Sequence, residues 1–368
     1  MRGIPFFSKA GATLFILILG LSGPPMLRGD MWLNNNGYWT NALSWQSGSV
    51  PSNVPAYVTY PVTVILDGPV PRITALNLWD NVRLVLTNNA HLSVSDIVLS
   101  HLNSSGTIVH ASGTLDAYGE FSMGPNVTNA SAHYYMQDGV LNIHTGRIHI
   151  GQFELNNSSR AHLFRQTGGT VRFLPTATSL ELSYFAEYRL ENGLLDLGGR
   201  SMLIRRTTSL FTFTGGVVQG VGALEFGLAF VQNGGVFRVG SSTSTFSTTL
   251  VASAAGQVNS FTCTAGRVEF DVFGGTGSND CFNLLSSSAQ LDLSGGTVFV
   301  NFTNYTPKVG DSWDFIKNTA NGTVTLSAAN VGSSSLPGLI FDTSQWVSQG
   351  ILTVQKLPPL KGSLLIVR

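Results

Sequence analysis

The sequence predicts an all-β fold, a single-stranded parallel β-helix (a solenoid) closed by an N-terminal aromatic cap and a small C-terminal β module. Three observations predict it. A short phrase recurs seven times between residues 134 and 300, at intervals of 19 to 31 residues. The intervening segments alternate apolar and polar residues, and none has a 3.6-residue apolar period with helix caps. A unit this short cannot bury its own apolar face, so successive copies must stack.

Each copy of the phrase has an aromatic or apolar residue, a polar pair, one or two glycines, and then alternating apolar positions. Glycine tolerates the positive φ of a tight corner between two strands. We expect the aromatic residue and the later Val or Leu to point inward and to stack on their equivalents in neighbouring coils. The copies occupy residues 135–143, 164–173, 188–197, 211–218, 230–239, 261–270 and 291–300.

Residues 1–29 are predicted to be a signal peptide. Arg2 and Lys9 precede a twelve-residue apolar run at 10–21, which is shorter than the roughly 20 residues of a membrane-spanning helix. Cleavage is expected between Ser22 and Asp30. No later stretch is apolar enough to span a bilayer, so the mature chain is expected to lack a membrane span and to be secreted or held at the cell surface.

Residues 30–61 are predicted to form the N-terminal cap. The segment is rich in proline, which disfavours helices and central strands. It also contains Trp32, Trp39 and Trp45 within fourteen residues. These tryptophans are candidates for a glycan-binding platform, but a lid over the exposed end of the stack is the favoured interpretation, because solenoids need terminal caps.

The predicted solenoid covers residues 62–300. Its first strands, at 62–66, 73–78, 82–86 and 92–99, are spaced by about ten residues, which suits three strands in each coil. After Asn301 the pattern changes, and residues 301–355 are predicted to be a β closing module. Residues 356–368 form a short tail.

Composition limits the partners. Charged residues make up 11% of the 368-residue chain, and 20 basic residues balance 20 acidic ones. The chain therefore has no global field that favours nucleic acid, and no nucleic-acid partner is expected. No motif indicates a cofactor. Extracellular polysaccharide and cell-surface components are the expected partner classes.

Histidine and cysteine supply the candidates for metal binding and cross-linking. All seven histidines lie between residues 91 and 162, and His91, His110 and His133 are spaced by about one coil. They are weak metal candidates, because no carboxylate partner is evident and solvated turn positions suit them better. Cys263 and Cys281 could form a disulfide in an exported protein, with two buried free thiols as the alternative.

The sequence offers few candidates for catalysis. Polysaccharide lyases and hydrolases use β-helices, and their chemistry needs paired carboxylates or a basic residue beside a carboxylate. Asp196, Arg200 and Arg205 form the best such grouping in this chain. The remaining acidic residues are scattered, so catalysis is the second hypothesis rather than the first.

The repeats resemble those of exported bacterial β-helix proteins with autotransporter-associated β-strand repeats, including relatives among the PEP-CTERM-sorted proteins. The similar tokens are the Gln-x-Gly-Gly phrases at 164–171 and 230–235, the Gly-x-Trp opening at 37–45 followed by Gly48 and Pro51, and the closing motifs at 310–313 and 336–354. The resemblance implies a right-handed β-helix, export, and a surface or matrix role without catalytic residues. No translocator barrel and no Pro-Glu-Pro sorting helix follow Val354, which puts cell attachment in doubt and leaves free secretion and truncation of the chain both open.

These observations favour an exported structural or adhesive β-solenoid without catalytic activity. A polysaccharide lyase or hydrolase on a β-helix groove is the alternative, together with a glycan-binding module built on the three N-terminal tryptophans.

Overall fold

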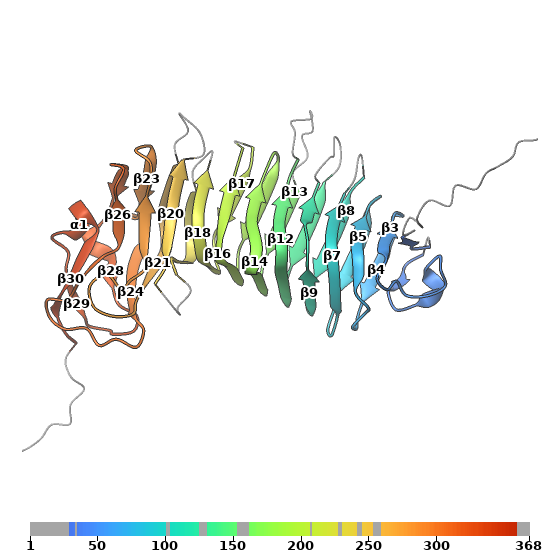
Figure 1. Ribbon diagram of the computed structural model, residues 1–368, viewed down its shortest axis with the longest axis horizontal. Coiled ribbons are helices and arrows are strands. Elements are labelled where there is room, and N and C mark those ends of the chain that lie inside the picture. The colour runs from blue at the N-terminus through green and yellow to red at the C-terminus, as the bar shows by residue number, and fades with distance from the viewer. Residues whose placement is uncertain are drawn as a thin grey trace, which may run out of the picture.

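The structure is a computed structural model, and it describes residues 29–33, 35–100, 104–124, 131–152, 162–206, 208–226, 230–240, 245–252 and 259–358. The predicted signal peptide, except Gly29, and most of the predicted tail lie outside these ranges. Within them, 27 strands form one continuous parallel sheet wound into a long stack of coils. The N-terminal coil lies at one end of the stack and a short helix, α1 (Trp346–Gln349), at the other (Figure 1). No helix in the described ranges is long and apolar enough to cross a membrane.

The coils have three faces, as the ten-residue strand spacing predicts. Some long strands continue from face 3 of one coil into face 1 of the next coil, so a single strand contributes to both faces. Face 1 consists of β1 (Asp30–Met31), β3 (Pro55–Val58), β5 (Ile73–Leu78), β10 (Phe121–Met123), β20 (Ser247–Ala252), β22 (Cys281–Leu284), β26 (Ile316–Asn318), and the later parts of β7 (His91–Leu99), β12 (Val140–Ile150), β14 (Thr170–Leu182), β16 (Leu194–Ile204) and β18 (Val217–Phe226).

Face 2 contributes one strand to each of twelve coils. It consists of β2 (Gly37–Tyr38), β4 (Thr63–Leu66), β6 (Val82–Leu86), β8 (Gly106–His110), β11 (Ala132–Met136), β13 (His162–Gln166), β15 (Ala186–Leu190), β17 (Leu210–Phe213), β23 (Ala289–Asp292), β27 (Thr323–Thr325), and the first parts of β19 (Phe230–Arg238) and β21 (Asn259–Val272).

Face 3 completes each coil at a glycine corner. It consists of the first parts of β7, β12, β14, β16 and β18, the later parts of β19 and β21, and the strands β9 (Thr114–Ala117), β24 (Thr297–Phe302) and β28 (Val331–Gly332). Coil length varies widely. Ala56 pairs with Leu76, 20 positions later, whereas Leu250 pairs with Leu284, 34 positions later.

A column of stacked aromatic rings fills the interior behind face 2. Neighbouring ring centroids lie 4.5–5.2 Å apart, with interplanar angles of 8–24°. This confirms the predicted inward stacking of the aromatic residue, with one correction: the stacked residue of the first copy is Tyr134, and Tyr135 points outward. Adjacent strand residues face opposite sides of a sheet, so a one-residue error reverses the face. The column consists of Tyr134, Phe164, Tyr188, Phe211, Phe230 and Phe261.

Two residues after each ring, a second inward column lies against the glycine corner. Gln166 is fully buried there, and its Nε2 donates to the carbonyl oxygens of Gly169 and Leu194 at 3.2 and 3.0 Å. Gln232 makes the equivalent bonds in a later coil. A tight corner leaves carbonyls pointing into the core, and a buried amide satisfies them. The Gln of the Gln-x-Gly-Gly phrase is therefore a structural residue.

The three N-terminal tryptophans form a lid rather than a platform. Trp32, Trp39 and Trp45 are 0, 0 and 1% exposed. The Trp45 ring contacts the other two edge-on, with centroid distances of 4.9 and 4.7 Å, and its Nε1 donates to the Trp39 carbonyl. This burial agrees with the favoured lid and argues against the alternative of a glycan-binding platform. The cap also includes the short 3-10 helix η1 (Ala42–Ser44).

The other end is closed by a separate antiparallel sheet. This sheet consists of β25 (Ser312–Asp314), β30 (Ile351–Lys356) and β29 (Ile340–Asp342), and α1 buries Trp346 beside it. Two predicted boundaries change. Parallel pairing already begins at β1, inside the predicted cap, and continues past residue 300 through β26, β27 and β28, next to η2 (Ala328–Asn330).

Candidate functional site

The residues predicted for catalysis do not converge. Arg205 follows β16 and pairs with Glu181 of the preceding coil at 3.3 Å. The Arg200 guanidinium donates to the Pro175 carbonyl. Asp196 lies on face 3, where it accepts a hydrogen bond from the Gly198 amide and lies 3.9 Å from Arg172. These three side chains therefore have three different sets of partners, and the predicted grouping is wrong.

Glu181 is the centre of an ion cluster that the sequence did not reveal. Its side chain is only 8% exposed, and it pairs with Arg147 at 2.9 Å as well as with Arg205. Arg147 also reaches Glu120. Although Glu181 is partly desolvated, the arginines and Ser179 lower its pKa. Opposite charges in contact across coils neutralise each other, so the cluster links four successive coils.

Outward charges on face 3 are paired in the same manner. One register column carries Asp116, Asn142, Arg172, Asp196, Gln219, Arg238 and Glu269 in successive coils. Arg238 bonds to Glu269 at 2.8 Å and to Gln219 at 3.2 Å, while Asn142 donates to Asp116. Each arginine of the column lies next to an acidic residue in an adjacent coil, so most of the charges on this face are compensated across coils.

The three histidines proposed as a metal ladder face different directions. His91 is on face 3 and His133 on face 2, whereas His110 is buried at a corner and bonds to the Tyr134 hydroxyl and the Gly113 carbonyl. The metal ladder is therefore wrong. Within the described ranges, no group of three or more His, Cys, Asp or Glu side chains could hold a metal ion.

A histidine–carboxylate arrangement does exist on face 3, contrary to the expectation that no such partner is present. Asp116 lies between His91 and His144, whose Nε2 atoms are 2.8 and 2.9 Å from its two carboxylate oxygens. Tyr118 stacks on His144 at 4.0 Å. Both carboxylate oxygens of Asp116 are thus occupied. Although Asp116 is partly desolvated, the hydrogen bonds from His144, Asn142 and His91 lower its pKa.

The two cysteines are free in the structure, which contradicts the predicted disulfide and matches its stated alternative. Both are buried. Cys263 contacts the Ala265 carbonyl, whereas Cys281 lies 3.1 Å from the Ser247 hydroxyl. Burial raises the pKa of the Cys263 thiol to about 11, so little thiolate forms near neutral pH.

Asp271 and Asp280 lie side by side, because the Asp280 amide donates to the Asp271 carbonyl oxygen. Burial, reinforced by the neighbouring Asp271, raises the pKa of Asp280 to about 7. A carboxyl group with such a pKa suits proton transfer near neutral pH. However, the two side chains are only 3 and 0% exposed, and Asp280 accepts hydrogen bonds from the amides of Phe246 and Asp271. A substrate has no direct access to it.

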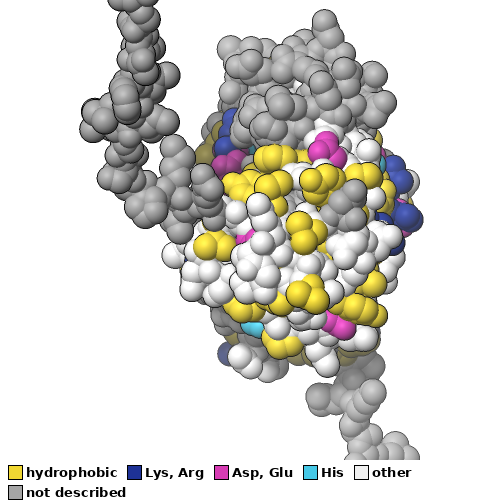
Figure 2. Space-filling view, turned by 90° about the vertical axis from the view of Figure 1, so that its right-hand side faces the viewer, with side chains coloured by type: hydrophobic (Ala, Val, Ile, Leu, Met, Phe, Trp, Pro, Cys, Tyr) yellow, Lys and Arg dark blue, Asp and Glu magenta, His cyan; other side chains and the backbone are white. Residues whose placement is uncertain are grey.

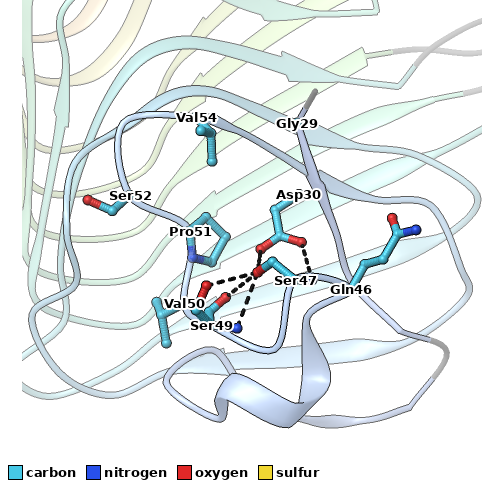
Figure 3. Close-up of a pocket in the computed structure, with 9 residues that line it drawn as sticks. All are labelled: Gly29, Asp30, Gln46, Ser47, Ser49, Val50, Pro51, Ser52 and Val54. Atoms are coloured by element: carbon cyan, nitrogen blue, oxygen red, sulfur yellow. Dashed lines mark hydrogen bonds between the residues drawn. The ribbon is translucent and has the colours of Figure 1, made fainter. Parts of the chain in front are cut away.

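A polar pocket of about 450 Å³ opens beside the N-terminal cap. Asp30 and three serines line it, with Val50, Pro51 and Val54 as its apolar side (Figure 3). The Asp30 carboxylate accepts hydrogen bonds from the amide and hydroxyl of Ser47, and that hydroxyl also lies 2.9 Å from the Ser49 hydroxyl. These groups satisfy one another and fix the turn, so few remain for a ligand.

The end of the stack itself carries exposed apolar side chains. Leu43, Tyr38 and Leu33 are 81, 52 and 45% exposed. Figure 2 views the molecule from this end and shows hydrophobic side chains scattered among uncharged polar groups. The hydrophobic side chains seen in this view do not form a continuous patch.

Face 2 carries a groove in which several polar side chains have no partner among the described residues. Val109, Tyr135 and Arg165 lie in one register column across three coils, because the inward positions belong to Ile108, Tyr134 and Phe164. A cavity of about 200 Å³ lies over this column, and we call it the face 2 groove. Its lining residues are Arg83, Thr107, Val109, Tyr135, Gln137, Arg165 and Thr167.

The two arginines of the groove differ in their partners. Arg165 forms a two-pronged pair with Glu191, with both N–O distances at 2.8 Å, which raises its pKa and fixes its plane. The Arg83 side chain is exposed and makes no ion pair or hydrogen bond to another described residue. The hydroxyls of Thr107 and Tyr135 and the side-chain amide of Gln137 likewise have no hydrogen-bond partner among the described residues. Sequence reasoning missed this groove, because its members come from four coils.

Comparisons with known proteins give no further identification. A scan against protein-family models, a search of curated proteins and a search of solved structures each return no match.

Proposed function

We propose that this chain is an exported β-solenoid that serves as a structural or adhesive component of a cell surface or extracellular matrix, with no catalytic activity of its own. The observation that carries the proposal is the coil-to-coil pairing of outward charges on face 3 and around Glu181. Catalysis needs charged groups aimed at a reacting bond, whereas these groups are aimed at one another. They strengthen a scaffold.

The repeat supports the same proposal. Its aromatic rings, glutamines and glycines occupy core and corner positions, so the repeated part of the sequence serves the stack. A long, sealed stack offers three faces on which to display binding groups, and folds of this kind carry function on the surface positions that the repeat leaves variable.

Incubation of the purified full-length chain with pectate, alginate and glucans, each with and without Ca²⁺, tests the proposal. We expect no new reducing ends and no ultraviolet absorbance from unsaturated uronide ends. Steady turnover that Arg205→Ala abolishes would refute a non-catalytic role and favour the lyase or hydrolase alternative. Retention of cells or of polysaccharide on a protein-coated surface is the positive readout.

A further inference from the structure

We propose that the face 2 groove is a binding site for the chain of an acidic polysaccharide, with Arg83 as the anion-binding residue and Tyr135 as the platform for a sugar ring. This inference rests on the proposed function, because it names the ligand of the adhesive surface.

Charge indicates an anionic ligand. Arg165 is already neutralised by Glu191, while Arg83 has no acidic partner among the described residues, so the groove carries one uncompensated positive charge. A guanidinium presents a planar set of donors that matches a carboxylate or a sulfate. Uronate and sulfated sugars share that chemistry, and both are abundant outside cells.

The floor of the groove suits a sugar ring. Tyr135 is half-buried and Val109 is 6% exposed, so together they form an apolar floor over two adjacent coils. An aromatic ring with a polar tip binds amphipathic surfaces, and the C–H face of a pyranose is one. Around this floor, the Thr107 hydroxyl and the Gln137 amide are available to bond to sugar hydroxyls.

The dimensions favour a chain over a monosaccharide. Arg83, Thr107, Tyr135 and Arg165 belong to β6, β8, β11 and β13, which are four consecutive coils of face 2. At about 4.8 Å per coil they span roughly 14 Å along the solenoid axis. The cavity of about 200 Å³ is shallow, so a linear polymer can lie along the face and place one ring over Tyr135.

The other large pocket has a weaker case. In the N-terminal pocket, the Asp30 carboxylate and Ser47 are bonded to each other (Figure 3), and the acidic group there would repel an anionic glycan. The face 2 groove combines a positive charge, an apolar floor and unsatisfied donors.

Calorimetric titration of the full-length chain with polygalacturonate, chondroitin sulfate and a neutral glucan tests the site. We expect binding to one or both acidic polymers, weakening as salt rises, and no binding to the neutral glucan. A preference for either acidic polymer identifies the anion. Arg83→Gln and Tyr135→Ala should each weaken binding by roughly tenfold, the factor that corresponds to a charge-assisted hydrogen bond or a buried ring contact.

Arg72→Gln is the matched control. It removes the same charge from the same end of the stack, but Arg72 bonds to Ser95 and lies over the Tyr118 ring, away from the groove. Three results would overturn the assignment of the groove as the binding site. They are an equal loss of affinity in this control, equal binding of the neutral glucan, and no binding of any acidic polymer. Far-UV spectra of the variants confirm that each is folded.

The same samples separate the two proposals. Cleavage of a bound polymer contradicts the non-catalytic function while leaving the groove assignment intact. Adhesion to a surface without any effect of Arg83→Gln or Tyr135→Ala leaves the function intact and removes the groove as its site.

Discussion

At the scale of single residues, the choice between tyrosine and phenylalanine in the interior ring column follows the corner residue of the preceding coil. Tyr188 donates to Gln166 Oε1 at 2.7 Å, and Tyr134 lies 2.7 Å from His110 Nδ1. Where the preceding corner residue is apolar, as with Leu190, the next ring is phenylalanine. A buried hydroxyl needs a partner, so ring and corner change together.

Gln232 is the exception, and it yields a prediction. Its corner is polar, but the next ring is Phe261, and its buried Oε1 has no partner. We expect Phe261→Tyr to donate to this oxygen and to raise the free energy of unfolding by about 1 kcal/mol. Phe211→Tyr is the matched control substitution, because its new hydroxyl would face the apolar Leu190 and Phe213 and find no hydrogen-bond partner. It should lower the free energy of unfolding by about 1–3 kcal/mol. Denaturant titration measures both, and equal effects would contradict the pairing rule.

A corner glycine gives a second residue-scale prediction. Gly193 has a φ of +90°, and a Cβ there would lie 2.5 Å from the Gly169 carbonyl oxygen of the coil below. Gly193→Ala should therefore destabilise the fold by roughly 1–3 kcal/mol. Gly275→Ala is the control, because a Cβ at Gly275 has no atom within 4 Å. Thermal melts compare the two, and an unchanged midpoint in Gly193→Ala would argue against coils packed this closely.

At the scale of strands and columns, buried histidines make stability depend on pH. Burial is the main cause that lowers the pKa of His110, His149 and His162 to about 4, from an ordinary value of 6.5. The unfolded chain takes up protons below pH 6.5, whereas the folded chain resists until about pH 4. Stability is therefore complete above pH 6.5 and is lost as the pH falls toward 4, by roughly 3 kcal/mol for each histidine.

A substitution copied from another coil of the repeat tests this. His110 bonds to the ring hydroxyl of the next coil and to the carbonyl three residues later, as Gln166 does. His110→Gln should keep the fold at pH 7 and flatten the decline in melting temperature between pH 6.5 and 4.5. A slope unchanged by His110→Gln would contradict the assignment.

The strand patterns also explain how much of the fold and of the candidate site could be predicted from the sequence. The alternation at residues 62–99 and the Gln-x-Gly-Gly phrases were enough for the three-sided coil and the inward aromatic column. The register between neighbouring coils could not be predicted from the sequence, because the coils differ in length. Glu181 contacts Arg205 across 24 positions and Arg147 across 34. Coils of unequal length hide which residues face each other. The ion cluster and the face 2 groove therefore needed the structure, whereas Asp196, Arg200 and Arg205, close in sequence, misled.

At the scale of the whole molecule, both ends of the stack must be sealed, and the tryptophan lid seals one. Trp39→Ala should cost roughly 3–5 kcal/mol, the usual loss for a buried large aromatic side chain. Leu43→Ala, at an 81% exposed position of the same cap, should change stability by less than about 0.5 kcal/mol. Denaturant midpoints test the pair. A stable Trp39→Ala variant that had lost glycan binding would restore the platform hypothesis.

The central claim is that the repeat builds one extended stack of coils. Small-angle X-ray scattering of the full-length chain tests it most directly. Twelve coils at about 4.8 Å each predict an ordered rod of roughly 55 Å along the stack, with the constant cross-section of a rod-like particle. A profile that fits a compact sphere would contradict the account.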